Sequence, residues 1–143
     1  MIRQATDTDR PEMLRMARDF IAASGLDLPF HAAYVSQSIA GQIAAPDRLA
    51  LVLELDGTLR GMLCAAHSQS PLAPVRVATE LVFWIDPMAR GPWAANMIQR
   101  YETWARAECC QLISMAAIGG RGADRLYQRA GYEPAERHFM KAL

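Results

Sequence analysis

The sequence predicts an α+β fold in which helices cover both faces of a mixed sheet. Two β-rich runs surround the dipeptide Asp56-Gly57, as in a hairpin. Apolar residues recur at helical spacing in the segments before and after this hairpin. Residues 81–85 are apolar at every position, as a strand covered on both sides requires. No repeat or long linker divides the chain, so we expect one domain over residues 1–143.

The first third of the chain is expected to hold a short strand and two helices. Residues 2–5 fit the strand, and Asp9 is a good helix N-cap ahead of an amphipathic run that ends at Gly25. A second helix is expected over about residues 31–44. The link between these helices, SGLDLPF, is short and suited to shaping a pocket wall.

The remaining elements alternate between strands and helices. Met97, Ile98, Tyr101 and Ala105 give one of the helices an inward apolar stripe. The expected strands are residues 49–55, 58–67, 75–85, 112–117 and 136–143, and the further helices follow residue 91 and span 123–130.

Composition excludes several classes of partner. Fifteen basic and fifteen acidic residues cancel, so no net field favours nucleic acid or an anionic membrane. Cys64, Cys109 and Cys110 have no metal-binding or disulfide spacing, so we expect reduced thiols and no metal. The N-terminus lacks the apolar run of a signal peptide, which predicts a cytoplasmic protein. Low net charge and exposed strand edges make a homodimer possible.

The turn after residue 85 is the strongest functional signal. An apolar strand stops at Asp86-Pro87, and Arg90-Gly91 then opens directly into an amphipathic helix. The unpaired N–H groups and the positive dipole end of such a helix form an anion site. The turn therefore predicts a cofactor that carries a pyrophosphate.

This turn resembles the signature of the GNAT family of acyl-CoA-dependent N-acyltransferases, Gln/Arg-x-x-Gly-x-Gly/Ala. In RGPWAA, Arg90 and Ala95 match, and Gly91 stands where many members carry the glycine of an Arg-Gly pair. Trp93 occupies the central glycine position. An indole there either points outward or toward the adenine, leaving the backbone N–H free, or covers the pocket.

A second element, GRGADRLYQRAGY, is similar to the family's Asn-x-x-Ala-x-x-(Phe/Leu)-Tyr-x-x-x-Gly-(Phe/Tyr). Gly120 replaces the asparagine. The opening IRQATDTDRPEM and the closing ERHFMKAL also resemble the family's first and last strands. The matching residues of the second element are Ala123, Leu126, Tyr127, Gly131 and Tyr132.

The resemblance implies a mostly antiparallel mixed sheet, acetyl-CoA as cofactor, and transfer of an acetyl group to a primary amine of a small molecule or peptide. In similar proteins, the backbone of the fourth strand pairs with the pantetheine arm, and the turn after it holds the pyrophosphate. The cofactor-binding residues would then be Phe83, Trp84, Ile85, Arg90, Gly91, Trp93, Ala94, Ala95 and Tyr127.

Glu80 and Tyr127 are the candidate proton carriers. Glu80 is the acid of an otherwise apolar strand end, so desolvation should raise its pKa toward the range of a general base. ELVFWI also resembles the strand of histone-acetylating members, whose catalytic glutamate lies at this position. Tyr127 would protonate the departing thiolate, because a tyrosine of this element often faces the cofactor sulfur in similar proteins and a phenol can donate a proton. Alternatively, Glu80 pairs with Arg76 at the surface, and Tyr127 packs in the core.

The acceptor site is expected between the first two helices, by resemblance. Phe30, His31 and Tyr34 are the candidate residues there, although a histidine is more often a surface or packing residue. The alternative to an enzyme is a catalytically inactive module on the same fold, which binds acyl-CoA or a protein. Pro92, Trp93 and Gly120 favour that alternative, because each departs from the family's pattern or removes a donor.

Overall fold

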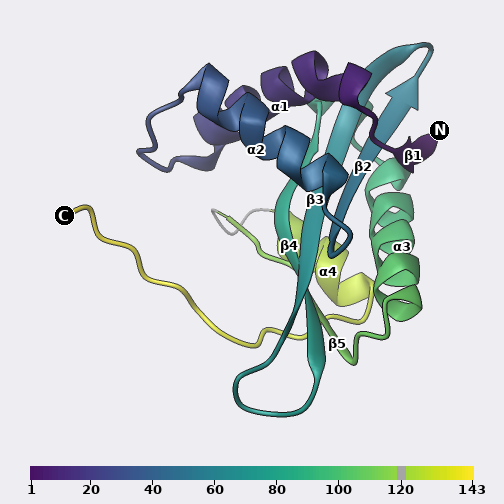
Figure 1. Cartoon of the computed structure of the whole chain (residues 1–143), viewed down its shortest axis with the longest axis vertical. Coiled ribbons are helices and arrows are strands. Elements are labelled where there is room, and N and C mark those ends of the chain that lie inside the picture. Colours follow the sequence, from purple (N-terminus) through teal and green to yellow (C-terminus); the bar gives the residue numbers. More distant parts are fainter. Residues whose placement is uncertain (119–121) are drawn as a thin grey trace.

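The computed structural model describes residues 1–118 and 122–143. A five-stranded sheet in the order β1-β2-β3-β4-β5 lies at its centre (Figure 1). Neighbouring strands are antiparallel except β4 and β5, which are parallel, so the expected mixed, mostly antiparallel sheet is confirmed. The elements are β1 (Ile2–Gln4), η1 (Asp7–Asp9), α1 (Arg10–Ser24), α2 (Ala32–Ala44), β2 (Arg48–Leu55), β3 (Thr58–Gln69), β4 (Arg76–Ile85), η2 (Pro87–Ala89), α3 (Pro92–Ala107), β5 (Leu112–Ser114) and α4 (Ala123–Arg129).

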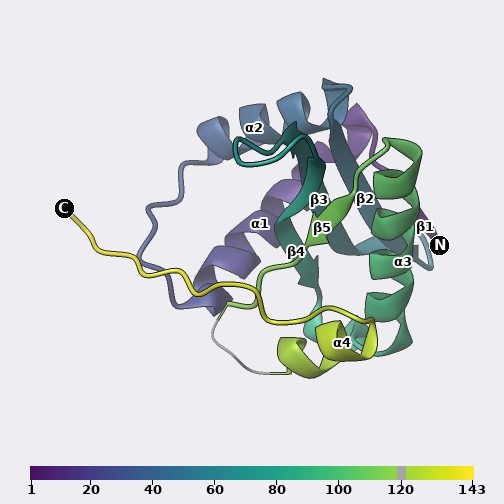
Figure 2. The same ribbon diagram turned by 90° about the horizontal axis from the view of Figure 1, so that it is seen from below.

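Helices cover both faces of the sheet, as expected. Figure 2 shows α1 and α2 on one face and α3, with α4 beside it, on the other. Because side chains alternate along a strand, Val52 packs on the α1–α2 face while its neighbours Leu51 and Leu53 pack on the α3 face. Met13 of α1 and Tyr101 of α3 are fully buried on their respective faces.

Two turns have the backbone that their residues predict. Asp56 and Gly57 join β2 to β3 with φ angles of 51° and 75°, the positive pair that a two-residue hairpin turn of type I′ needs. Gly25 ends α1 in the left-handed conformation, with φ 74°.

Asp9 lies at the N-cap of α1, but its carboxylate does not bond the helix N–H groups. It accepts the Thr6 N–H at 2.8 Å and two hydrogen bonds from the Arg3 guanidinium. The two charge-assisted hydrogen bonds from an arginine stabilise the carboxylate more than a single bond from a helix N–H would. Asp9 therefore joins the start of α1 to β1.

The prediction of a final strand over residues 136–143 is wrong. Residues after α4 run away from the domain and end clear of it (Figures 1 and 2). An extended segment becomes a strand only where a neighbouring strand supplies hydrogen bonds, and the described part of the chain supplies none to this segment. The strand expected over residues 112–117 is also shorter, Leu112–Ser114.

A bulge in β4 determines which residues face which helices. Cys64 pairs with Val82 and Ala65 with Glu80, so Leu81 is an extra residue in β4. The extra residue reverses the alternation: Ala78 before it and Ile85 after it both pack on the α3 face. Glu80 lies two residues after Ala78 and before the bulge, so it faces α3 as Ala78 does. Without the extra residue, Ile85 would face the opposite side of the sheet from Glu80's neighbour Ala78.

Candidate active site

The site begins where β4 and β5 separate. Their pairing ends at Thr79 and Ser114, whereas β4 stays paired with β3 as far as Ile85. From Glu80 to Ile85, one edge of β4 thus has no strand partner among the described residues. This opening exposes main-chain groups of a central strand, which a ligand can use as a missing strand would.

The backbone of Phe83 and Ile85 points into this opening. Main-chain groups alternate in direction along a strand, and the Asp86 N–H donates to the Arg60 carbonyl of β3 at 2.7 Å. Residue 84 therefore also faces β3, while residues 83 and 85 face the opposite side. The Ile85 carbonyl accordingly accepts a hydrogen bond from Arg90 Nε at 3.1 Å.

Asp86 fixes the end of β4. The residue is 5% exposed, and its carboxylate accepts hydrogen bonds from the Trp84 indole at 2.9 Å and from Arg15 of α1 at 3.1 and 3.2 Å. Burial opposes its ionisation, but the bonds from Arg15 and Trp84 outweigh burial and hold the pKa of Asp86 below its usual value. Arg60 lies 3.5 Å away and adds to this effect. The Trp84 side chain is thereby locked toward α1.

Glu80 lies at the fork between the two strands. Its side chain is buried, and Oε2 accepts the Ala116 N–H at 3.0 Å. Burial raises the pKa of Glu80 to about 7, although the bond from Ala116 opposes the shift. The alternative in which Glu80 pairs with Arg76 is not found, because the Arg76 guanidinium donates to the Glu108 carbonyl instead. A carboxyl with this pKa exchanges protons near neutral pH.

Tyr127 of α4 reaches the same residue from the other side. Its hydroxyl donates to the Ala116 carbonyl at 3.0 Å, so Glu80 and Tyr127 bond the N–H and the C=O of one residue. Burial and then the charge of Glu80 raise the pKa of Tyr127, which keeps the phenol protonated at neutral pH. Both candidate proton carriers therefore converge at the fork.

Helix α3 begins beside the end of β4 with free donors. Gly91, at its N-cap, has φ 150°, a conformation that disfavours other residues, and Pro92 starts the helix. Among the described residues no side chain caps this end; Ala94 N–H makes a weak bond to the Gly91 carbonyl at 3.3 Å. The first-turn N–H groups and the helix dipole can thus hold an anion.

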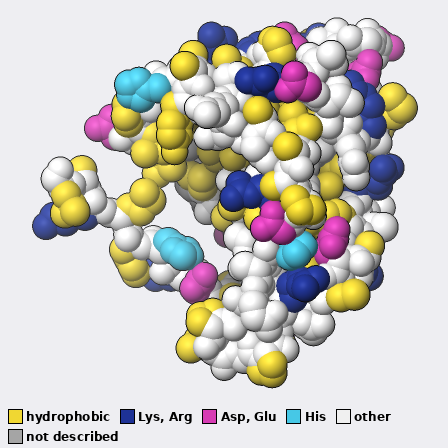
Figure 3. All heavy atoms as spheres, viewed as in Figure 1, with side chains coloured by type: hydrophobic (Ala, Val, Ile, Leu, Met, Phe, Trp, Pro, Cys, Tyr) yellow, Lys and Arg dark blue, Asp and Glu magenta, His cyan; other side chains and the backbone are white. Residues whose placement is uncertain are grey.

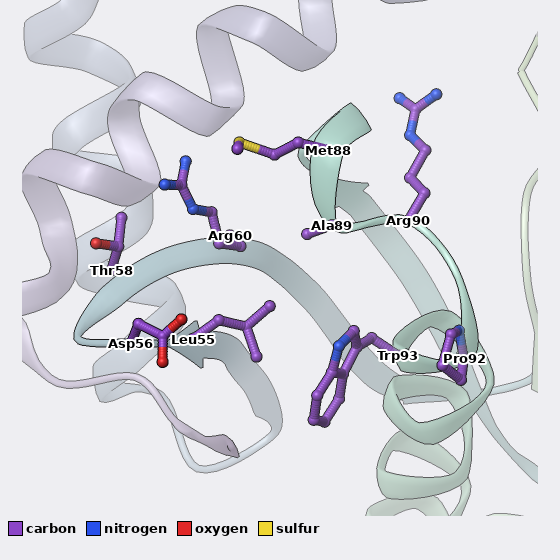
Figure 4. A pocket seen from close by; sticks show the side chains of 9 residues that line it. All are labelled: Leu55, Asp56, Thr58, Arg60, Met88, Ala89, Arg90, Pro92 and Trp93. Carbon is purple, nitrogen blue, oxygen red and sulfur yellow. The ribbon is translucent and has the colours of Figure 1, made fainter.

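Trp93 and Arg90 diverge from this turn (Figure 4). The indole of Trp93 is half-buried and directed toward the β2–β3 hairpin, where it lines a pocket of about 380 Å³ together with Leu55 and Arg60. That pocket includes neither proton carrier. The Arg90 guanidinium instead lies 5.3 Å from the centre of the Trp84 ring. The Trp93 ring therefore packs against the hydrophobic core on the α3 face of the sheet.

The expected acceptor residues lie apart from the fork. Phe30 and His31 precede α2, and Tyr34 in its first turn is 73% exposed. Over residues 1–118 and 122–143, no hydrogen bond links these three to Glu80 or Tyr127. Gly120, at the start of the second family element, lies outside the described residues, as does Arg121.

Two residues of the site carried little signal in the sequence. Ala116 acts only through its main chain, which no residue type reveals. Asp86 was visible as the end of a strand before a proline, but its bonds to Arg15 depend on the packing of α1. The described residues include no cluster of metal-ligating side chains and no helix long and apolar enough to cross a membrane.

The chain belongs to the acetyltransferase (GNAT) family, whose model matches residues 12–132. A predicted acetyltransferase from Clostridium acetobutylicum, solved with acetyl-CoA, has a TM-score of 0.83 and 15% identity, covering 99% of this chain and 95% of that one. An aminoglycoside antibiotic 6′-N-acetyltransferase from Acinetobacter baumannii has a TM-score of 0.80 and 21% identity, covering 100% and 98%. A similar enzyme from Acinetobacter haemolyticus has a TM-score of 0.79 and 19% identity, covering 100% and 99%. The search of curated proteins found no match.

These likenesses confirm the family and the fold. Members of the family use acetyl-CoA, which confirms the expected cofactor at the level of the family. The structure fits such a group: uncapped N–H groups follow Gly91, and the main chain of Phe83 and Ile85 faces an opening without a strand partner in the described residues.

We expect the buried Glu80 carboxyl to make stability depend on pH. Its pKa is near 7 when folded and near 4.5 when exposed, so the folded state holds the proton more tightly. The contribution of Glu80 to the free energy of unfolding is therefore fully present below pH 4.5, and it falls by about 3 kcal/mol as pH rises through 7. Glu80→Gln should remove this loss, stabilising the protein at pH 8 but not at pH 4.5, in urea denaturation. Equal stability changes at both pH values would contradict the shift; Glu133→Gln, at an exposed site, is the control.

Proposed function

We propose that the protein is an acetyl-CoA-dependent N-acetyltransferase in which a primary amine attacks the thioester directly within a ternary complex. The observation that carries the proposal is the convergence at one opening of four features: the free edge of β4, the uncapped start of α3, Glu80 and Tyr127. Membership of the family supplies the reaction class.

The main chain of the protein would bind and orient the cofactor. The first turn of α3 would hold the pyrophosphate, and the main-chain groups of Phe83 and Ile85 that face the opening would pair with the pantetheine arm. A backbone N–H of this edge would also stabilise negative charge on the carbonyl oxygen, which is worth about 3 kcal/mol. Acetyl-CoA, when bound, supplies the thioester carbon that the amine attacks.

Glu80 and Tyr127 would move the two protons of the reaction. Glu80 would accept a proton from the amine, directly or through water, as its carbon–nitrogen bond forms. Tyr127 would exchange its bond to the Ala116 carbonyl for one to the departing sulfur and donate its proton as the carbon–sulfur bond breaks. Its raised pKa supports donation rather than loss of the proton to solvent.

The rest of the proposal concerns partners. The acceptor would be a small-molecule or peptide amine that enters past Phe30, His31 and Tyr34, in a cytoplasmic and homodimeric protein. Two similar structures carry names of aminoglycoside-acetylating enzymes, which makes polycationic amines a first set to test. The alternative of an inactive module finds no support in the comparisons, and the Trp93 ring points to the hairpin.

The proposal is tested by cofactor binding and turnover. Acetyl-CoA should raise the melting temperature, and release of the CoA thiol should follow addition of a suitable amine. Glu80→Gln should slow turnover about 100-fold and remove a rising limb of kcat near pH 7, while leaving the thermal shift intact. No thermal shift with millimolar acetyl-CoA would defeat the proposal.

Tyr127→Phe tests the proton donor. The variant keeps the ring packing but loses the hydroxyl at the Ala116 carbonyl, so kcat should fall about tenfold or more at unchanged KM for acetyl-CoA. Tyr132→Phe is the matched control, because its ring lies 6.2 Å from that of Tyr127. If both variants lose the same activity, Tyr127 is not the proton donor, because loss of either hydroxyl then lowers activity only by disturbing the structure.

Ala95→Glu tests the anion site. Ala95 is exposed in the first turn of α3, where an acid suits the helix dipole but would repel a bound diphosphate. Calorimetry should show that coenzyme A binds about tenfold or more weakly, with the melting temperature of the free protein unchanged or higher. Gln99→Glu, exposed one turn farther along α3, should bind normally. Unchanged affinity in Ala95→Glu would place the diphosphate elsewhere.

A further inference from the structure

The side chain of Arg90 turns away from the anion site at the start of α3. Its guanidinium carbon lies 5.3 Å from the centre of the Trp84 ring. Trp84 packs with the buried residues of the α1–α2 face, whereas α3 covers the opposite face of the sheet (Figure 2). Figure 4 shows the same divergence, with Arg90 directed away from Pro92 and Trp93. The guanidinium therefore lies on the α1–α2 side of β4, although the Arg90 main chain leads into α3.

Two contacts hold this guanidinium at the opening beside β4. Arg90 Nε donates to the Ile85 carbonyl at 3.1 Å, and that carbonyl faces the opening. The Trp84 ring supplies a flat surface on which the guanidinium makes a favourable cation–π contact. The ring is itself fixed, because its indole N–H donates to Asp86 at 2.9 Å and Asp86 is bonded to Arg15 of α1. The Arg90 side chain is thus oriented by the protein itself.

Arg90 keeps hydrogen-bond donors and charge that a ligand can use. In the part of the chain that the structure describes, Nε is the one side-chain donor of Arg90 with a protein acceptor, and no carboxylate pairs with the guanidinium. The buried Asp86 carboxylate is already shared by Arg15 and Arg60. The donors on Nη1 and Nη2 of Arg90 can hold the two oxygens of one carboxylate. Arg90 is exposed, so a ligand can reach them.

An acceptor on the α1–α2 side would meet Arg90 near one end of the opening and Glu80 near the other. Figure 3 shows the molecule hollowed below α1 and α2, with hydrophobic side chains gathered around the hollow. Glu80 and Ile85 are five residues apart in β4, which is at most about 17 Å along a strand. A carboxylate held by Arg90 would therefore lie several bonds from an amine that Glu80 can deprotonate.

We propose that the Arg90 guanidinium binds a carboxylate of the acceptor, so that the protein prefers primary amines that carry a carboxylate several bonds away. This inference rests on the proposed acetyltransferase function. The carboxylate takes no part in the transfer: the amine nitrogen bonds the acetyl carbon as the carbon–sulfur bond breaks, Glu80 takes the amine proton, and Tyr127 protonates the sulfur. The cofactor diphosphate stays with the main-chain N–H groups of α3. Polycationic amines would be repelled by the guanidinium.

Matched pairs of acceptors test this preference. ω-Amino acids of increasing chain length are each compared with their own carboxamide at low salt. We expect kcat/KM to be at least about tenfold higher for the best carboxylate than for its carboxamide, and salt should reduce this ratio. A ratio near one at every chain length, or no turnover of the whole series, would overturn the inference.

A thermal shift with acetyl-CoA separates this failure from failure of the proposed function. If the cofactor still raises the melting temperature, the carboxylate preference alone is wrong. If the cofactor gives no shift, the proposed function is wrong and the inference falls with it.

Arg90→Gln, with Arg100→Gln as its match, adds a second test. Glutamine removes the charge, so the ratio of kcat/KM between carboxylate and carboxamide should fall to near one, mainly through KM for the acceptor. Arg90→Lys keeps the charge but loses the planar fork, so part of the ratio should remain. Arg100→Gln removes the same charge at an exposed position of α3 and should keep the ratio.

An unchanged ratio in Arg90→Gln would contradict carboxylate binding by Arg90. Calorimetry with coenzyme A then identifies the other role of the side chain, since weaker binding by that variant would assign the guanidinium to the cofactor diphosphate.

Discussion

The loss of one strand partner along β4 is the constraint on which the site depends. β4 stays paired with β3 up to Ile85 but with β5 only up to Thr79. No other described residue pairs with the rest of this edge, so main-chain groups of a central strand face an opening next to the uncapped start of α3. Unpaired backbone groups are costly when buried, so the opening is suited to a ligand that presents peptide-like groups and a diphosphate.

Two buried acids lie along this opening, and their surroundings shift their pKa values in opposite directions. Asp86 is surrounded by Arg15, Arg60 and the Trp84 indole, so it stays charged and holds the end of β4 against α1. Glu80 is buried and accepts a hydrogen bond from the Ala116 N–H, and burial outweighs this bond and raises its pKa toward neutrality. The first carboxylate is suited to anchoring and the second to carrying a proton. Their pKa values differ because their neighbours differ, although one acid lies in β4 and the other directly follows it.

The family and its cofactor follow from local features, whereas the acceptor does not. Main-chain donors at a helix start can be inferred from a strand, a glycine and an amphipathic run, and the family match agrees with that inference. An acceptor pocket depends on how loops such as the one before α2 close over the sheet. The similar structures, at 14–21% identity, share the fold and differ in the substrates that their names print.

The sequence by itself determined the elements, because each is specified by local periodicity and turn chemistry: Asp56-Gly57 for the hairpin, Gly25 for the end of α1, Gly91 for the start of α3. It also placed Glu80 in an apolar strand. Only the tertiary structure decided the bulge at Leu81, the meeting of Glu80 and Tyr127 at Ala116, and the fate of residues 136–143. These depend on pairing between segments distant in the chain, and a strand pattern does not say which edge will pair with it.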